Sequence, residues 1–284
     1  MAKILKAAAV AEIQRQFPEN CLDDKILMHW AKDGRECEIF KEKNRICFDS
    51  ELFDKWLARL AGSLVVLDRD DYVKCFEFAV EAFYSSVTKA DFNRSKQRDV
   101  GEFLTNQVRG KLGEIAVARL FEKRSISMQL DFSVTGQIPA QDIVQISTRK
   151  NIWNNTAAKV SIKATKYKNV LLTVTENEAK LADRKSDIYL LSQVGLFPDH
   201  ILRILKGVVG ELSPKLPKMI PDFGPIPARV AGWATYDQLI ARPALSGAES
   251  ESEYGIRFSS KNHIMRTAEL STDWEKLTAM IVGS

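Results

Sequence analysis

The sequence predicts an α+β fold in which a small N-terminal domain precedes a mixed β-sheet flanked by helices. Two observations lead to this class. Up to about residue 123, apolar residues recur mainly at helical spacing, and from about Ser125 the apolar period changes to two. The chain has 284 residues and is 45% hydrophobic, so it can bury a substantial core, and general disorder is excluded.

The composition also limits the compartment. No apolar run approaches the roughly 18 to 20 residues needed to span a bilayer, so no membrane association is expected. The opening stretch "MAKILKAAAVAEIQRQF" contains Glu12, Gln14 and Arg15, which is typical of an amphipathic helix and not of a signal sequence. We therefore expect a cytoplasmic protein. Its four cysteines lack the spacing of a zinc site and are expected to be reduced thiols (Cys21, Cys37, Cys47 and Cys75).

Charge is distributed unevenly along the chain. The net charge is +4, and residues 1 to 97 hold 16 basic and 17 acidic side chains, which leaves 25 and 20 for the remainder. Six basic residues and no acidic ones lie between Arg149 and Lys168. A solvated charged face is the usual origin of such a run, but this one coincides with the strand-like "KVSIKATKYKNVLLTV", so a polyanionic partner is also expected.

Residues 1 to 65 are predicted to form the small domain. They read as a helix over about 4 to 17, a second helix over about 22 to 32, a hairpin around the turn "KEKN", and a third helix in "DSELFDKWLARLAG". Asp49 or Ser50 can cap the third helix. Helix, helix, hairpin, helix is the order of a small winged helix.

In "ILMHWAKDGR", the hairpin and "FDSELFDKWL", residues 5 to 62 resemble the excisionase and MerR-like winged-helix family. The resemblance implies that the second helix enters the major groove of DNA and that the hairpin, or wing, contacts phosphates. The implied contacts come from Lys25, His29 and Lys32 on the helix, and from Arg35, Lys41, Lys43 and Arg45 on the wing. The alternative is a domain that packs on the rest of the chain or binds protein, since acidic residues dilute the charge of the wing (Asp33, Glu36, Glu38 and Glu42).

Residues 66 to 284 are predicted to form the larger domain. It should begin with a helix over about 70 to 87, whose aromatic residues are expected in the core, and a long helix over about 101 to 123. The predicted strands are "SMQLDFSV", "DIVQIST", "AKVSIKAT", "NVLLTV", "SDIYLLSQV" and "RILKGVVGEL". The stretch "ENEAKLAD" is predicted to be helical, and "STDWEKLTAMI" to be a terminal helix capped by Ser271.

Asp142 and Lys163 carry the candidate chemistry. If "DIVQIST" and "KVSIKAT" pair antiparallel about residues 152 to 153, these two residues face one another. A phosphodiester is anionic and water is a poor nucleophile, so its hydrolysis needs a hard cation held by oxygen ligands and a positive group near the water. We expect Asp142 and the Ile162 carbonyl to bind the metal, and Lys163 to orient or deprotonate the water.

Glu114 is a further candidate within "RGKLGEIAVARLF". It shares a helical stripe with Val117 and Phe121, which is unfavourable for a charge without a partner. Gly110 and Gly113 each cost about 1 kcal/mol in a helix, which suggests a close approach there. One interpretation is a carboxylate linked to a metal. The other is a boundary glutamate paired with Arg119 or Lys111.

Taken in order, "GKLGEIAVARLF", "QDIV", "VSIKATK", "LLTVTENE" and "SDIYLL" resemble the PD-(D/E)XK nuclease superfamily, specifically type II restriction endonucleases, over about residues 90 to 240. The resemblance implies a restriction-endonuclease-like core and Mg²⁺-dependent hydrolysis of double-stranded DNA at specific sequences, with Mn²⁺ able to replace Mg²⁺. Two positions depart from the pattern, because Gln141 precedes Asp142 and Ser161 takes the acidic place of the second half-motif. The missing carboxylate is then expected from Glu176, Glu178 or Glu114.

Several other features complete the expectations. The loop "RKNIWNN" should project toward a groove and offer Arg149, Lys150, Trp153, Asn154 and Asn155, although an ordinary hairpin turn is the alternative. Pro198-Asp199 and Pro221-Asp222 are predicted turns, and the three histidines (His29, His200 and His263) are predicted surface or capping residues.

Cleavage of both DNA strands most simply needs a homodimer. The apolar residues Tyr72, Phe76 and Phe83, on a helix outside the presumed catalytic sheet, are candidates for its interface, and burial within the chain is the alternative. The competing functions are a methylation-dependent, repair or junction nuclease and a non-catalytic DNA-binding regulator.

Overall fold

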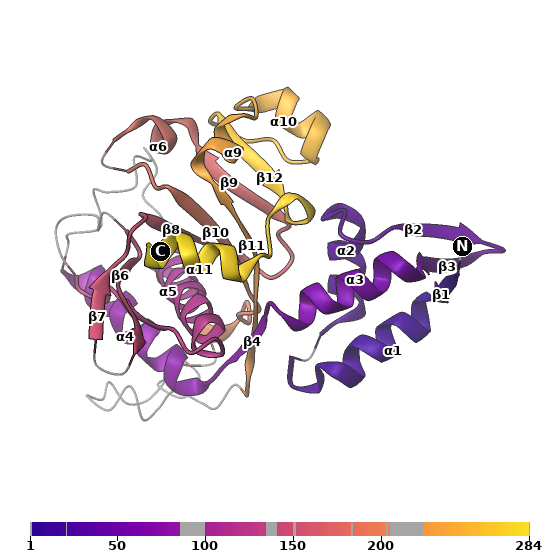
Figure 1. Ribbon diagram of the computed structural model, residues 1–284, viewed down its shortest axis with the longest axis horizontal. Coiled ribbons are helices and arrows are strands. Elements are labelled where there is room, and N and C mark those ends of the chain that lie inside the picture. Colours follow the sequence, from indigo (N-terminus) through magenta and orange to yellow (C-terminus); the bar gives the residue numbers. More distant parts are fainter. Residues whose placement is uncertain are drawn as a thin grey trace.

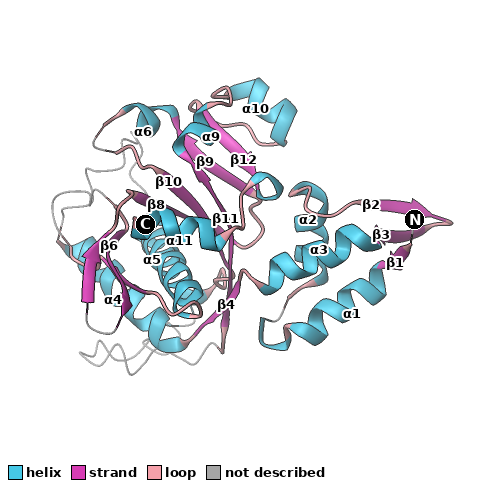
Figure 2. Cartoon of the chain, viewed as in Figure 1, coloured by secondary structure: helices cyan, strands magenta, loops and turns pink. Residues whose placement is uncertain are grey.

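The computed structural model describes residues 2–20, 22–85, 100–134, 141–149, 152–182, 184–202, 204 and 224–283. A smaller unit built from the N-terminal part of the chain lies at one end of the molecule, and the remaining elements form a larger unit beside it (Figure 1). Helices and strands are intermixed in both units (Figure 2), so the predicted α+β class is confirmed at that level.

The N-terminal unit contains a three-stranded sheet and three helices. Its elements are β1 (Lys3–Leu5), α1 (Lys6–Gln16), α2 (Asp24–Asp33), β2 (Ile39–Glu42), β3 (Arg45–Asp49) and α3 (Ser50–Ala61), with strand order β1-β3-β2. Asp23 and Asp49 cap α2 and α3 by accepting backbone hydrogen bonds. Lys43 and Asn44 both have positive φ, as a two-residue type I′ hairpin turn requires. The predicted helices and hairpin are confirmed, and β1 is an addition.

In its described residues, the larger unit contains one mixed sheet and two smaller sheets. Its elements are β4 (Leu64–Leu67), α4 (Arg69–Tyr84), α5 (Val100–Glu122), β5 (Ser127–Leu130), β6 (Ile143–Arg149), β7 (Ile152–Asn155), β8 (Val160–Lys166), β9 (Leu171–Thr175), α6 (Glu176–Lys180), β10 (Ile188–Val194), β11 (Ile226–Thr235), α9 (Tyr236–Ile240), α10 (Gly247–Tyr254), β12 (Asn262–Arg266) and α11 (Trp274–Val282). The mixed sheet has the order β4-β11-β10-β8, and only the β10–β8 pair in it is parallel. The other sheets are β12-β9 and β5-β6-β7.

The two faces of the mixed sheet are covered by different elements. Val160 and Ile162 of β8 belong to the main core together with α4 and α5. Tyr189 and Leu191 of β10 pack on the other face, in a cluster with residues of β9, α6, α9 and β12. Since successive strand residues point to opposite faces, Ser161 and Lys163 lie on the face away from α5.

Helix α5 approaches the sheet closely at one glycine. A Cβ on Gly113 would lie 2.4 Å from the Ala164 Cβ and 3.4 Å from the Ser192 Cβ, whereas a Cβ on Gly110 would meet nothing within 4 Å. The predicted close approach is therefore confirmed at Gly113 and wrong at Gly110. Tyr72 and Phe76 of α4 are buried in the same core, so they are intrachain core residues and give no support to a dimer interface.

The predicted antiparallel pairing of "DIVQIST" with "KVSIKAT" is wrong. Residues 152 to 155 are not a turn but strand β7, which pairs back on β6, while β8 pairs in parallel with β10. The buried residues of β8 and β10 pack into one core, and this long-range pairing outweighs the short connection. Asp142 is consequently not opposite Lys163 in a ladder.

Other local predictions have mixed outcomes. Pro198-Asp199 lies in a turn, whereas Pro221-Asp222 and most of "RILKGVVGEL" lie outside the described residues. Asp273, not Ser271, caps the terminal helix α11. His200 is buried, not superficial, because the Tyr72 hydroxyl and the Thr105 hydroxyl bind its two ring nitrogens at 2.7 and 3.2 Å. In the described part of the chain, no helix is long and apolar enough to cross a bilayer.

Candidate active site

Asp142 lies where two sheets separate. Its backbone N–H donates to the Val160 carbonyl at 3.1 Å, and its Oδ2 accepts the Ile162 N–H at 2.5 Å. The carboxylate thus takes a ladder position at the free edge of β8, immediately before β6 turns away into the other sheet. The Ile162 carbonyl is a predicted metal ligand. In a β-strand, the N–H and C=O of one residue point to the same edge. That carbonyl therefore faces the edge that carries Asp142.

Lys163 and Glu178 form an ion pair beside this edge. The Lys163 Nζ lies 2.5 Å from the Glu178 Oε1, and both side chains are partly exposed. Thr175 caps α6 by accepting the Glu178 N–H, which fixes the start of the helix. Glu176 instead pairs with Lys180 on the exposed side at 2.9 Å. Residues two apart on a helix point in nearly opposite directions. Because α6 begins at Glu176, Glu178 faces Lys163 and Glu176 faces away from it.

Glu114 lies on α5, on the other side of Asp142. Its side chain is about 10% exposed, and its Oε2 accepts a hydrogen bond from the Lys111 Nζ at 2.8 Å. The alternative of a pair with Lys111 is therefore confirmed, whereas Arg119 pairs with Asp71. From the sequence, Lys111 is predicted only as that possible partner and not as a member of the site. Its position three residues before Glu114, on the same helical face, was the available sequence signal.

The electrostatics link these groups into one site. Burial raises the pKa of Glu114 to about 8, the charge of Asp142 adds to the rise, and Lys111 opposes it. Burial also raises the pKa of Asp142, while the Ile162 N–H, Lys163 and Lys111 counteract this. The carboxylates are therefore close enough to repel each other in a poorly solvated place. Together with Lys163 and Glu178 they form what we call the edge cluster: Lys111, Glu114, Asp142, Lys163 and Glu178.

The edge cluster contains carboxylate oxygens, which are the kind of donor that Mg²⁺ binds. Across the described residues, no three His, Cys, Asp or Glu side chains converge to hold a metal. Mg²⁺, however, needs only one or two carboxylates, because it keeps several water ligands and also binds substrate phosphate. Asp142 and Glu114 each have one oxygen outside the hydrogen bonds described above. A cation between them would offset the burial that raises the pKa of both carboxyl groups and the charge of Asp142 that adds to the rise at Glu114.

The predicted DNA-contacting residues of the N-terminal unit lie at the surface. Lys25, His29 and Lys32 share one face of α2, opposite the buried Leu27, Trp30 and Ala31. His29 Nδ1 contacts Asp33 at 2.6 Å, which reduces its availability. The remaining predicted contacts are exposed on and before the β2–β3 hairpin (Arg35, Lys41, Lys43 and Arg45).

The residues predicted to form a loop at 149 to 155 lie largely in a strand. Trp153, Asn154 and Asn155 are exposed on β7, an edge strand, and neighbouring side chains point to opposite faces. The two asparagines therefore do not present one common surface. The side chain of Arg149 and the whole of Lys150 lie outside the described residues.

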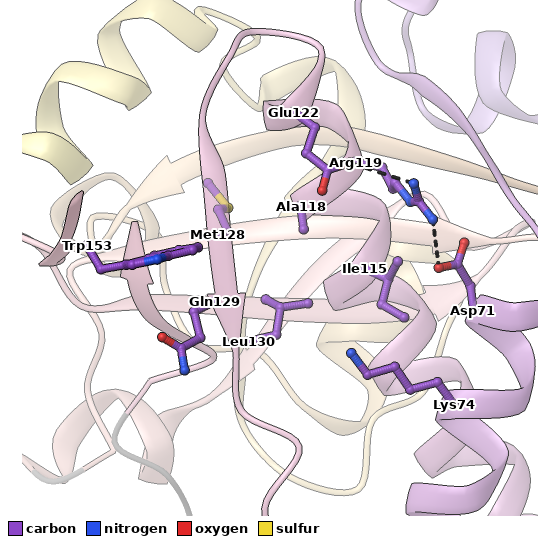
Figure 3. A pocket seen from close by; sticks show the side chains of 10 residues that line it. All are labelled: Asp71, Lys74, Ile115, Ala118, Arg119, Glu122, Met128, Gln129, Leu130 and Trp153. Atoms are coloured by element: carbon purple, nitrogen blue, oxygen red, sulfur yellow. Dashed lines mark hydrogen bonds and ion pairs between the residues drawn. The ribbon is translucent and has the colours of Figure 1, made fainter. Parts of the chain in front are cut away.

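A pocket of about 430 Å³ lies between α4, α5, β5 and β7 (Figure 3). The Trp153 ring lies near Met128 at one end, and the Asp71–Arg119 ion pair lies at the other. Ile115 and Ala118 of α5 also line it. None of the edge cluster lines this pocket, so the candidate catalytic groups occupy a separate, partly exposed edge.

Comparisons with known proteins found no match to any family model, to any curated protein or to any solved structure.

Proposed function

We propose that the protein is a Mg²⁺-dependent endonuclease that cuts double-stranded DNA at specific sequences. The observation that carries this proposal is the position of Asp142, a carboxylate at the free edge of β8 with Lys163–Glu178 on one side and Glu114–Lys111 on the other. Acidic oxygens and an ammonium group at a sheet edge suit hydrolysis of an anionic ester.

Each group of the edge cluster has a role in this proposal. Asp142, Glu114 and the Ile162 carbonyl would hold Mg²⁺, which supplies Lewis-acid activation of water and phosphate when bound. Lys163 is partly exposed, and its charge acts on the Asp142 carboxyl, so it would orient the attacking water and stabilise negative charge developing on phosphate oxygens. Glu178 holds Lys163 in place. Ser161, half-buried on the same face of β8, provides no charge to the site.

The surface of the N-terminal unit supports DNA as the substrate. Lys25 and Lys32 are one exposed pair on α2, and Lys41, Lys43 and Arg45 lie at the hairpin at the far end of the unit (Figure 1). Basic side chains on an exposed helix and a hairpin are suited to a groove and to phosphates, respectively. Cleavage of both strands would then require two centres, and we propose a homodimer on the DNA.

The test is digestion of mapped plasmid DNA, methylated and unmethylated, with Mg²⁺ or Mn²⁺. We expect discrete bands from the wild-type protein, and a loss of at least 100-fold in rate for Asp142→Asn and Lys163→Met with retained DNA binding. Bands only with methylated or branched DNA would indicate the related nuclease class. Cleavage by both variants within tenfold of wild type would remove the edge cluster from the reaction.

Glu178 and Glu176 provide a matched pair of variants in this assay. Glu178→Gln removes the counter-ion of Lys163, so we expect the rate to fall by at least tenfold. Glu176→Gln removes only an exposed pair with Lys180, and its rate should stay within about twofold of wild type. Equal effects of the two substitutions would contradict the assignment of Glu178.

A second candidate function is a non-catalytic DNA-binding regulator. It is favoured by the short contact between Lys163 and Glu178, which occupies the lysine. Sequence-specific DNA binding without cleavage, in the presence of either metal, would support this function and exclude the nuclease.

A further inference from the structure

The pocket of Figure 3 combines an apolar centre with a polar rim. Its volume of about 430 Å³ falls in the range of roughly 300 to 1,000 Å³ that small-molecule sites occupy. Gln129 and the Asp71–Arg119 ion pair lie at the rim. Four apolar side chains lie toward the centre (Ile115, Ala118, Met128 and Leu130). Such a lining suits a flat ligand that has an apolar face and hydrogen-bonding groups at its edge.

Trp153 adds an exposed aromatic face to this pocket. Trp153 is 44% exposed, whereas each of the other four tryptophans is at most 7% exposed. Its indole lies at one end of the pocket, near Met128 (Figure 3). Unpaired bases of nucleic acids stack on exposed aromatic side chains of this kind. Trp153 therefore offers a stacking surface to a planar ligand.

The charges that line the pocket cancel. Asp71 and Glu122 supply two carboxylates, and Lys74 and Arg119 supply two cations. The Arg119 guanidinium group lies 3.1 Å from Asp71 and 3.8 Å from Glu122, so its charge is already compensated. A phosphate group would gain no net attraction from this lining. The pocket therefore favours an uncharged ligand.

Gln129 gives the pocket a means of selecting among bases. It is exposed on β5, and its side-chain amide carries two hydrogen-bond donors and an acceptor. A glutamine amide can form two hydrogen bonds with adenine, at N6 and N7. Adenine is therefore the base that this lining fits best.

The pocket and the edge cluster are neighbours. Ile115 of the pocket directly follows Glu114 of the edge cluster on α5. Lys74 of the pocket and Lys111 of the edge cluster place their ammonium groups 4.1 and 5.2 Å from the centre of the same ring, that of Phe132. DNA bound at the edge cluster would therefore have the pocket beside it.

We infer that this pocket binds a single nucleobase, adenine in preference to the others, that has turned out of the DNA bound at the edge cluster. The inference rests on the proposed function, which supplies DNA as the ligand. A base inside a duplex is covered by its neighbours, so it must leave the stack to meet Trp153. Trp153 and Gln129 then determine specificity without touching the reacting phosphate.

The first test uses 2′-deoxyadenosine and the full-length protein without metal. Tryptophan emission and equilibrium dialysis should show saturable quenching and one nucleoside per chain, because Trp153 is the exposed tryptophan. Deoxyribose and inorganic phosphate, which lack a base, should neither quench the emission nor compete. Deoxythymidine should bind more weakly, and Gln129→Ala should remove that difference.

Trp153 and Ile152 provide a matched pair of variants. Trp153→Ala removes the stacking surface, so we expect the affinity measured by dialysis to fall by roughly 5- to 150-fold. Ile152 is the adjacent residue of β7 and is 53% exposed, but it does not line the pocket. Ile152→Ala should therefore bind within about twofold of wild type. Circular dichroism and thermal unfolding establish that each variant is folded.

The second test uses DNA, again without metal. A duplex in which one adenine lies opposite an abasic position should bind at least fivefold more tightly than the fully paired duplex, because its adenine leaves the stack at lower cost. Trp153→Ala should abolish this preference, and Ile152→Ala should keep it.

Three results would overturn the inference. They are the lack of saturable nucleoside binding by the wild-type protein, an unchanged affinity in a folded Trp153→Ala protein, and equal affinities of the wild-type protein for the two duplexes. The first and third need no variant to fold. DNA cleavage is measured separately, so base binding without cleavage removes the proposed function and keeps the base pocket, whereas cleavage without base binding does the reverse.

Discussion

At the scale of single residues, the burial of Glu114 gives the protein a pH dependence that its composition does not suggest. A solvated glutamate has a pKa near 4.5, but burial and the neighbouring Asp142 raise the pKa of Glu114 to about 8. The native state therefore keeps a proton that the unfolded state has lost between these two pH values. The stability from this group is fully present below about 4.5 and is lost as the pH rises through about 8.

We predict that the free energy of unfolding of the wild-type protein, compared with Glu114→Gln, falls as the pH rises from 5.5 to 8.5 without metal. The slope should approach 1.4 kcal/mol per pH unit, for a total of roughly 3 kcal/mol, because one proton differs between the native and unfolded states. Urea unfolding at several pH values measures it. The measurements start at pH 5.5 because buried His200, whose pKa is lowered to about 4, also makes the free energy of unfolding depend on pH, mainly below that value. A difference independent of pH would mean that Glu114 is ionised throughout.

At the scale of elements, α5 meets the sheet through Gly113. The sequence places two glycines three residues apart on this helix and does not distinguish them, since both lower helix propensity. Only Gly113 lies against another backbone layer, at Ala164 of β8. This contact sets the distance between the helix that carries Glu114 and the strand that carries Lys163.

We predict opposite effects of alanine at these two glycines. Gly113→Ala should lower the free energy of unfolding by about 1 to 3 kcal/mol, because its Cβ would overlap that of Ala164 and force the helix outward. Gly110→Ala should raise it by about 0.5 to 1 kcal/mol, because an alanine there has room and stiffens the unfolded chain. Urea unfolding of both variants tests this. Stabilisation by both substitutions would show that the α5–β8 contact can relax.

The residue at which helix α6 begins decides which of two glutamates contacts Lys163. The stretch "ENEAKLAD" offers two acidic residues at its start, and either was an acceptable neighbour for Lys163. The Thr175 cap fixes the first turn, so Glu176 faces Lys180 and Glu178 faces β8. A one-residue change in the start of the helix would redirect both side chains.

At the scale of the whole molecule, a buried ion pair joins the two units. Glu36 was expected on the surface of the wing, where its charge would weaken DNA contacts. Its side chain is instead fully buried and accepts two hydrogen bonds from the guanidinium group of Arg229, also fully buried, and one from the Trp56 indole at 3.1 Å. The Trp30 indole also donates to the Tyr167 carbonyl at 3.0 Å across the same boundary. The N-terminal unit is thus held in one orientation on the larger unit.

We predict that Arg229→Met destabilises the protein by about 3 to 5 kcal/mol, because buried Glu36 would lose its two hydrogen bonds to the guanidinium group and keep only the more distant Arg59, at 3.9 Å, to offset its charge. Adding Glu36→Met should recover part of that loss, since apolar side chains would replace the pair, and Arg59 would lose the carboxylate but keep its hydrogen bonds to the Ala231, Thr267 and Leu270 carbonyls. Arg242→Met removes the partly exposed pair with Glu269 and serves as the control, with an expected cost below about 1 kcal/mol. Thermal or urea unfolding reports all three. A cost for Arg229→Met no larger than the control would show that the units separate easily.

The sequence by itself determined the features that depend on near neighbours. The helices α2 and α3 follow from apolar spacing and an aspartate cap, and the β2–β3 hairpin follows from a polar turn, because each signal and its effect lie within a few residues. The strands β6, β8, β9 and β10 were also recognisable from their alternation. Asp142, Lys163 and Glu114 could be selected because a charge in an apolar pattern is conspicuous.

Only the tertiary structure decided which of these elements meet. The parallel pairing of β8 with β10, the departure of β6 after Asp142 and the burial of Glu36 against Arg229 all join residues far apart in the chain. Such contacts depend on how several apolar faces share one core, and no short stretch of sequence contains that information. The partners of the predicted charges, Lys111 for Glu114 and Glu178 for Lys163, became definite only when the fold brought each ammonium group within hydrogen-bonding distance of its carboxylate.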